Sequence, residues 1–282
     1  MAGTLFVVAT PIGNLEDISA RALRILGEVA LIAAEDTRRT AHLLSRYAIR
    51  TPTTSLHAHN EAKKSSSLVA RLQRGDSIAL VSDAGTPTVS DPGQRLIRAA
   101  IDAGIRVEAI PGPSAALAAL AASGIPAETF IFLGFPPTRS TARAEWFRSV
   151  ESAKHPIIFF EAPHRIAQTL DDLRRMVGDR TVAIGRELTK AHEEWVRGPI
   201  SGVLSRLSPP RGEYTVVIKE GHSPEIDSVA AHDTAAIARE FGELTVDGGL
   251  PRRDAIRQIA KRYCVSARVV YGAIEDAKKS GL

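Results

Sequence analysis

The 282-residue sequence predicts an α/β protein of two successive domains with a small helical extension. Short apolar segments alternate with amphipathic ones through the first half, which is typical of a mostly parallel sheet with helices on both faces. The alternation restarts after Gly124-Ile125-Pro126, and the pattern is helical only from about Thr234. We therefore predict αβα domains over residues 1–124 and 125–221, followed by a linker and helical extension over residues 222–282.

The predicted strands of the first domain are short, β-rich and bounded by turn residues: residues 5–9, 29–34, 78–81 and 106–110. Amphipathic helices are predicted between them, over residues 19–26, 60–74 and 91–103. Asn60 is a favourable N-cap for the second of these helices, and Gly75 a favourable stop. Asp91 is the predicted N-cap of the third helix, with Pro92 in its first turn.

The second domain has predicted strands over residues 130–133, 157–160, 181–184 and 214–219, and predicted helices over residues 142–150, 165–177 and 200–207. In the extension, residues 253–271 have a helix-turn-helix pattern. Ala260 stands where two helices must approach closely, residues 264–266 form the turn, and Ser266 caps the next helix. Nine basic and seven acidic residues from Ala231 onward make the extension only weakly basic, so packing or docking fits as well as binding in a nucleic acid groove.

Composition excludes several protein classes. Hydrophobic residues make up 44% and charged residues 24%, which excludes a disordered or low-complexity chain. The single cysteine, Cys264, excludes an intramolecular disulfide and a cysteine-clustered zinc site. The sequence has no secretory signal pattern, and its longest uncharged stretch, residues 109–127, has too many breakers for a membrane helix. We expect a cytoplasmic protein without a membrane span.

The net charge is +4, and its distribution along the chain is uneven. Residues 37–75 contain eight basic residues and one acidic residue, Glu61, together with three histidines. This segment fits a surface that faces a polyanion. A set of solvated helix faces, with counter-charges from elsewhere in the fold, explains the same pattern equally well.

Residues 79–93 contain the densest group of candidate ligand-binding residues. The predicted strand ends at Ser82-Asp83, and a turn rich in glycine, threonine and proline follows. Ligands of open α/β sheets bind outside the carboxyl ends of the strands, where this turn is expected. Asp83 can accept hydrogen bonds there, and Gly85 allows a ligand to approach the backbone closely. The alternative is a well-capped turn without a ligand.

Two further strand ends contribute candidates. After residue 110, Pro-Gly-Pro leads into an alanine-rich helix, with Pro113 in its first turn and free amides at Ser114 and Ala115. Residues 9–19 occupy the place of a dinucleotide-binding loop but lack the G-x-G-x-x-G pattern. Although Glu35 and Asp36 end the next strand, the missing glycines disfavour a nicotinamide enzyme.

Other polar clusters have simpler explanations. His57, His59 and Glu61 are spaced like metal ligands, but a helix capped by Asn60 explains the segment better, and we predict no metal site. Glu187 and Lys190 are spaced for an ion pair. The sequence contains no P-loop, no HExxH motif and no Ser-His-Asp order.

Seven motifs occur in order along the chain: residues 8–19 (VATPIGNLEDIS), 34–38 (AEDTR), 57–61 (HAHNE), 79–87 (ALVSDAGTP), 111–114 (PGPS), 134–136 (GFP) and 186–190 (RELTK). Together they resemble the tetrapyrrole methylase superfamily of S-adenosylmethionine-dependent enzymes, and more closely its branch that methylates ribosomal RNA. The resemblance covers about residues 4–220, and the helical tail resembles the extension of that branch.

The resemblance implies two αβα domains with S-adenosylmethionine (SAM) in the cleft between them, and a homodimer. It also implies methyl transfer to the ribose 2′-oxygen of a cytidine in the decoding region of 16S rRNA in the small ribosomal subunit. Matched by position, the cofactor-binding residues would be Ile12, Asp83, Gly85, Thr86, Ser114, Ala115, Phe160, Tyr214 and Thr215.

A ribose hydroxyl is a poor nucleophile at neutral pH, so it must be positioned and must lose its proton during the attack. A general base contributes roughly 10²–10⁴-fold to such a step. The candidate bases are Lys190, with a pKa lowered by burial, Glu187, Glu35 and Asp36. The candidate phosphate-binding residues are Arg38, Arg39, Arg165 and Arg186.

Two other functions fit parts of the sequence. A tetrapyrrole methylase would share the fold and cofactor, but residues 10–14 (TPIGN) replace the glycine-rich opening of that branch. A non-catalytic regulator that senses a small ligand and binds DNA through the tail is the second alternative. The large ligand-cleft portion of the chain and the weak charge of its tail disfavour it.

Overall fold

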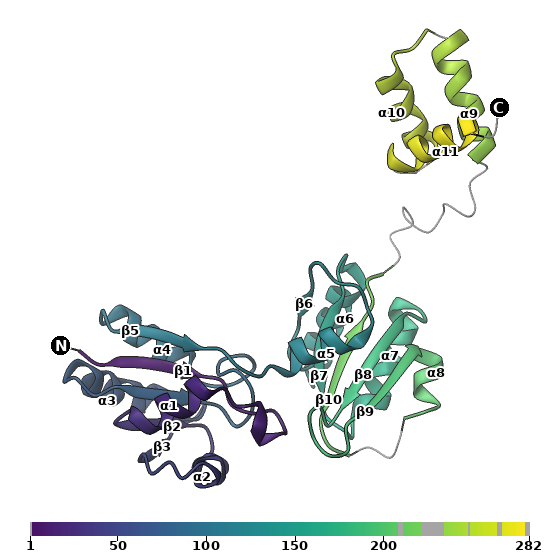
Figure 1. Ribbon diagram of the computed structural model, residues 1–282. Helices are drawn as coiled ribbons and strands as arrows, with labels where there is room; N and C mark the ends of the chain where they lie inside the picture. The colour runs from purple at the N-terminus through teal and green to yellow at the C-terminus, as the bar shows by residue number, and fades with distance from the viewer. Residues whose placement is uncertain (1, 208–210, 222–233, 248, 264–266, 280–282) are drawn as a thin grey trace. The chain divides into compact units, whose positions relative to one another are not determined.

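The computed structural model describes residues 2–207, 211–221, 234–247, 249–263 and 267–279. It consists of two compact units, Met1–Glu220 and Gly221–Leu282 (Figure 1). The first unit contains two five-stranded sheets, and the described part of the second is helical. The predicted fold class is confirmed, whereas the predicted boundary at residue 124 stays a prediction.

The first sheet is entirely parallel and has the order β3-β2-β4-β1-β5. Its strands are β1 (Thr4–Val8), β2 (Leu31–Ala34), β3 (Thr53–Ser55), β4 (Ile78–Val81) and β5 (Arg106–Ile110). Four of them were predicted. The edge strand β3 was missed because its three residues, Thr-Thr-Ser, form no apolar segment.

Helices cover both faces of this sheet, as predicted. They are α1 (Ala20–Glu28), α2 (Thr37–Arg46), α3 (Glu61–Gln73) and α4 (Gln94–Asp102), with a short 3₁₀ turn η1 (Leu15–Asp17) before α1. Apolar residues of α1 and α2 pack on one face, and those of α3 and α4 on the other. The carboxyl ends of the five strands consequently share one edge, where their loops form one side of the site described below.

The start of α4 differs from the prediction. Asp91 is not its N-cap, because the helix begins at Gln94 after Gly93, whose φ of +123° only glycine adopts readily. The buried carboxylate of Glu61, on α3, instead accepts hydrogen bonds from the amides of Gly93, Arg95 and Leu96 at 3.1, 2.7 and 3.3 Å. A distant side chain therefore caps this helix, and Asp91 is left for another role.

The second sheet has the order β6-β7-β10-β8-β9 and is antiparallel except between β6 and β7. Its strands are β6 (Ile131–Phe132), β7 (Ile157–Glu161), β8 (Thr181–Arg186), β9 (Glu194–Pro199) and β10 (Tyr214–Ile218). The strand β9 was not predicted, because Glu-Trp-Val-Arg-Gly-Pro has no apolar alternation. It pairs with β8 along its full length.

Three helices pack on one face of the second sheet: α6 (Ser140–Ser152), α7 (Ile166–Val177) and α8 (Ile200–Leu204). The other face is covered by α5 (Ala115–Ser123), through Ala116 and Ala119. The helix begins at Ala115 with Ser114 as its N-cap, so Pro113 precedes the helix and does not lie in its first turn as predicted. Because α5 follows β5 directly in the chain and packs on the second sheet, its first turn lies at the connection between the two sheets.

The described part of the second unit has α9 (Thr234–Gly242), a π-helical turn η3 (Glu243–Asp247), α10 (Arg252–Arg262) and α11 (Ala267–Lys279). Ile237, Ile259 and Val270 form its core, against which Ala260 packs. The predicted turn over residues 264–266 and the predicted cap Ser266 lie outside the described residues. None of the helices in the described ranges is long and apolar enough to cross a membrane.

Candidate active site

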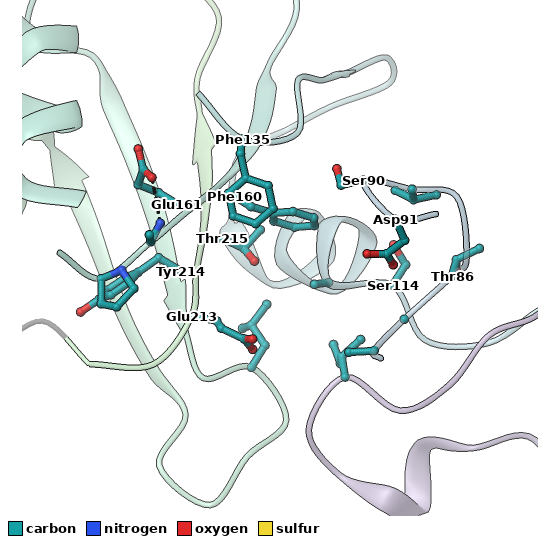
Figure 2. Close-up of a pocket in the computed structure, with 18 residues that line it drawn as sticks. Thr86, Ser90, Asp91, Ser114, Phe135, Phe160, Glu161, Glu213, Tyr214 and Thr215 are labelled. Atoms are coloured by element: carbon teal, nitrogen blue, oxygen red, sulfur yellow. Dashed lines mark hydrogen bonds between the residues drawn. The ribbon is translucent and has the colours of Figure 1, made fainter. Parts of the chain in front are cut away.

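A cavity of about 360 Å³ lies within the first unit and is lined from both sheets (Figure 2). Cavities of this size hold small ligands and cofactors. One side comes from the loops after β1, β4 and β5, and the other from the ends of β7 and β10 with their adjoining loops. The lining residues are Ile12, Ala84, Gly85, Thr86, Val89, Ser90, Asp91, Ser114, Ala115, Phe135, Phe160, Glu161, Ala162, Pro163, Leu188, Glu213, Tyr214 and Thr215.

The structure brings together most of the residues expected to bind the cofactor. Those that line the cavity are Ile12, Gly85, Thr86, Ser114, Ala115, Phe160, Tyr214 and Thr215. The exception is Asp83, which holds the strand ends together. Its carboxylate accepts the amide N–H of Asp36 at 2.9 Å and lies 3.5 Å from the guanidinium of Arg39.

Backbone contacts fix the first side of the cavity. Thr10 and Gly85 exchange two backbone hydrogen bonds of 2.9 and 3.0 Å, which join the loops after β1 and β4. Gly85 has a φ of +77°, and a Cβ atom there would lie 3.4 Å from the side chain of Ile12. The hydroxyl of Thr86 donates to the carbonyl of Pro113 at 3.2 Å and joins the loops after β4 and β5.

The amino end of α5 opens on the same cavity. Ser114, its N-cap, accepts a hydrogen bond from the amide of Leu117 at 3.5 Å. The first amides of a helix have no partner within the helix, and the helix dipole places partial positive charge there. The cavity therefore has one end suited to a carboxylate of a ligand.

Asp91, an acidic side chain that sequence reasoning assigned to a helix cap, also lines the cavity. The pKa of Asp91 is raised to about 6, chiefly by burial and also by the nearby charges of Glu35 and Asp83, against a hydrogen bond from Ser82 that lowers it. Burial also raises the pKa of Glu35. No signal in the sequence placed Asp91 in the cavity, because Asp-Pro before a helix is ordinary capping chemistry.

The four predicted proton acceptors, Glu35, Asp36, Glu187 and Lys190, are not among the residues lining the cavity. Burial alone would lower the pKa of Lys190, but hydrogen bonds to Glu187 at 2.9 Å and Glu213 at 3.1 Å raise it overall. The predicted lowering is therefore wrong. The hydrogen bond from Lys190 lowers the pKa of Glu187, so the two form the ion pair that their spacing predicted.

The loop after β8, which carries this ion pair, contacts the loop after β1 and so links the first sheet to the second. Thr189 accepts a hydrogen bond from the amide of Asn14 at 3.0 Å. A Cβ atom on Gly13 would lie 2.5 Å from the side chain of Lys190, so only glycine fits there. Glu187 and Thr189 have φ values of +52° and +64°, and such strain in non-glycine residues is typical of functional loops.

The predicted phosphate-binding arginines divide into two pairs. Arg38 and Arg39 are exposed, with 89% and 65% of their side chains accessible. Arg165 pairs with the buried carboxylate of Glu161 at 3.2 Å. Arg186 donates to Glu194 at 2.8 Å and to a backbone carbonyl at 3.0 Å. Arg165 and Arg186 thus stabilise the second sheet. Arg38 and Arg39 pair with Asp36 and Asp83, but their side chains remain accessible to phosphates.

An exposed aromatic residue that sequence reasoning did not single out stands at the rim of the cavity. Phe135 is 53% exposed, and its ring centroid lies 5.4 Å from that of Phe160 (Figure 2). The amide of Phe160 donates to the carbonyl of Gly134 at 2.8 Å, and Arg165 donates to the carbonyl of Pro136. These contacts anchor the backbone on both sides of Phe135.

Within the described ranges, no three His, Cys, Asp or Glu side chains are grouped as metal ligands. The segment considered for a metal site has other roles. His57 contacts Asn60 at 3.0 Å, and Glu61 caps α4.

Comparison with known proteins confirms the resemblance that the motifs predicted. Residues 4–203 match the family model of Tetrapyrrole (Corrin/Porphyrin) Methylases. Among solved structures, a diphthine synthase has a TM-score of 0.60 at 14% identity, covering 78% of this chain and 92% of that one. Uroporphyrin III C-methyl transferase from Thermus thermophilus has a TM-score of 0.57 at 16% identity, covering 77% and 98%. At these identities the structures show the fold alone.

Sequence relatives are more specific. Ribosomal RNA small subunit methyltransferase I of Mesorhizobium japonicum is 48% identical over 278 residues, covering 97% of this chain and 92% of the relative. The protein of the same name from Bacillus subtilis is 40% identical over 273 residues, covering 96% and 94%. The chain therefore belongs to the tetrapyrrole methylase family and, within it, to the family of ribosomal RNA small subunit methyltransferase I.

Proposed function

We propose that this protein uses SAM to methylate small-subunit ribosomal RNA, at the ribose 2′-hydroxyl of a cytidine in the decoding region. The observation that carries the proposal is a cavity lined by eight of the residues expected to bind the cofactor, in a chain whose relatives are named ribosomal RNA small subunit methyltransferase I. A solved structure with the same fold, uroporphyrin-III C-methyl transferase from Thermus thermophilus, is a complex with S-adenyl homocysteine.

The residues of the cavity fit such a cofactor. SAM carries a carboxylate, two positive groups and a flat aromatic base. The amino end of α5 at Ser114 and Ala115 suits the carboxylate. Ile12 and Phe160 provide apolar surface for the base. When bound, the cofactor would supply a methyl group on a positive sulfur.

The rim of the cavity fits single-stranded RNA. Sequence-specific RNA binding commonly uses bases that leave the stack and rest on aromatic side chains. The exposed ring of Phe135 provides such a surface, and Arg38 and Arg39 provide positive charge on α2 for phosphates. Because all three side chains are accessible before binding, no large rearrangement is needed to present them.

For methyl transfer to the ribose, the protein must chiefly position the 2′-hydroxyl group and accept its proton. Positioning two reactants in the correct geometry contributes roughly 7–11 kcal/mol. Phe135 and the arginines would hold the nucleotide, and a carboxylate of the cavity would receive the proton. The ion pair of Lys190 and Glu187 supports the loop beside the cavity, so we assign it a positioning role.

The test is transfer of labelled methyl groups from SAM to small ribosomal subunits that lack the modification, followed by digestion of the rRNA to nucleosides. Label on the ribose of one cytidine is the expected result. Label on a base would refute the 2′-O assignment. No transfer to subunits or free rRNA, despite tight cofactor binding, would refute the rRNA substrate and make uroporphyrinogen the next substrate to test.

The homodimer, the cytoplasmic location and the intact subunit as substrate are part of the same proposal. Light scattering after size exclusion tests the first directly: the expected mass is twice 30.2 kDa. A mass of one chain at micromolar concentration would refute it.

A further inference from the structure

Three carboxylates line the cavity, and two of them already have partners. Glu161 is 1% exposed, accepts hydrogen bonds from Thr169 and the amide of Ala162 at 2.6 and 2.8 Å, and pairs with Arg165. Glu213 is 74% exposed and pairs with Lys190 at 3.1 Å. Asp91 takes part in no ion pair among the described residues. It is therefore the cavity carboxylate that remains available to a substrate.

The loop between β4 and α4 holds Asp91 in place. Thr88, Ser90 and Gly93 all have positive φ values, of +73°, +69° and +123°, so the loop adopts one strained course rather than a relaxed turn. The hydrogen bond from the amide of Gly93 to Glu61 anchors its far end. Figure 2 shows the carboxylate of Asp91 across the cavity from Phe160, on the same side as Ser114.

The charges around Asp91 come from two neighbouring strand ends. Glu35 follows β2, and Asp83 follows β4. Arg39 of α2 lies against Asp83 rather than against Asp91. Ser82 donates a hydrogen bond to Asp91. Like charges and burial make the carboxylate of Asp91 a better proton acceptor than an exposed aspartate while leaving it ionised at neutral pH.

We propose that Asp91 is the catalytic base that accepts the proton of the attacking hydroxyl group. This inference rests on the proposed function. As the hydroxyl oxygen bonds to the methyl carbon, the carbon–sulfur bond breaks and its electron pair stays on sulfur. The hydroxyl proton passes to a carboxylate oxygen of Asp91 and then to solvent. Glu35 acts as a positioning residue, because its charge sets the proton affinity of Asp91 from outside the cavity.

The experiment compares the full chain with its Asp91→Asn and Glu35→Gln variants. Single-turnover methyl transfer to unmodified small subunits is measured from pH 5 to 9, and S-adenosylhomocysteine binding is measured by calorimetry. Carbon-13 NMR follows the carboxyl group of Asp91 in the ligand-free chain. We expect the Asp91→Asn rate to fall about 10²–10⁴-fold, with cofactor binding changed less than threefold. The wild-type rate should decline below about pH 6, with the same midpoint as the NMR titration.

Glu35→Gln tests the assignment further, because it removes a like charge and should shift both midpoints to lower pH together. An Asp91→Asn variant with an undiminished rate would overturn the proposal while leaving the proposed function intact. So would a variant that loses cofactor affinity tenfold or more but transfers normally at saturation, since Asp91 would then hold the cofactor. Failure of the wild-type chain to methylate the subunits would instead refute the proposed function itself.

Discussion

Glu61 of α3 caps the start of α4, and substituting it tests how these two helices are held together. It is 6% exposed in the first turn of α3, and one of its oxygens accepts three backbone amides at the start of α4, over distances of 2.7 to 3.3 Å. Glu61→Ala removes that acceptor and leaves the amides of Gly93, Arg95 and Leu96 without it.

Hydrogen bonds to a charged group contribute about 1.5–3 kcal/mol each, and the three bonds share one oxygen, so they are not additive. An N-cap acceptor contributes about 1 kcal/mol, and the charge at two helix starts adds about 0.3–1 kcal/mol. We therefore expect Glu61→Ala to lower the free energy of unfolding by about 3 kcal/mol. Glu61→Gln keeps an oxygen acceptor but no charge, so its loss should be about 1 kcal/mol.

Urea denaturation followed by circular dichroism measures these losses, and hydrogen exchange should show the amides of Gly93, Arg95 and Leu96 losing protection first. Glu28→Ala is the control, because Glu28 is a helical glutamate that is 57% exposed and, in the part of the chain that the structure describes, is ion-paired only with Arg24. Its loss should stay below about 0.5 kcal/mol. A Glu61→Ala variant no less stable than Glu28→Ala would refute the capping argument.

Three other predictions follow from single residues. Gly93→Ala should lower the free energy of unfolding by about 3 kcal/mol, because a Cβ atom there would lie 2.6 Å from the side chain of Leu80 at a φ of +123°. Gly104→Ala, at a φ of +70° with open space around it, should lower it by about 1 kcal/mol. Equal losses in urea denaturation would contradict this. Asp91→Asn should stabilise the fold at pH 8 by about 1 kcal/mol after allowing for solvent screening, because the raised pKa of Asp91 makes its charged form unfavourable in the folded state. That gain in stability should shrink as the pH falls through 6 and vanish below 3.8, where the carboxyl group is protonated in both the folded and unfolded states. Thermal melts at several pH values measure the gain. A gain that grows in acid would contradict the raised pKa of Asp91. Hydrogen bonds from Arg38 lower the pKa of Asp36 to about 2, so Arg38→Ala should raise that pKa toward 3.8 in a carbon-13 NMR titration, and an unchanged value would exclude Arg38 as the cause.

Strand and helix periodicity was sufficient to predict most elements of the first unit. The strands β1, β4 and β7 were expected within a residue or two, because buried apolar segments bounded by turn residues are distinctive. The strands β3 and β9 were missed, since one is short and polar and the other lacks alternation. Their pairing comes from neighbouring strands, and sequence patterns within a segment do not record that.

The candidate site divides in the same way. The sequence named eight residues that line the cavity: the strand-end loops indicated Gly85, Ser114 and Ala115, and motif resemblance added the others, because loops at strand ends are short and their chemistry is local. It also placed Lys190 and Arg165 in functional roles, whereas their neighbours in space, Glu213 and Glu161, hold them in ion pairs. Whether a charged side chain faces a ligand or another residue depends on what lies opposite, which can be far away in the sequence.

The sequence by itself determined the fold class, the family and the loops that form the cavity, because each of these depends on residues close together in the chain. Only the tertiary structure decided which carboxylates remain free. Glu61 lies on α3 but caps α4, so Asp91 does not serve as the N-cap that its sequence neighbours predict and instead lines the cavity. Burial and the charges of Glu35 and Asp83 then set the proton affinity of Asp91, because the loops after β2 and β4 meet only in the folded chain.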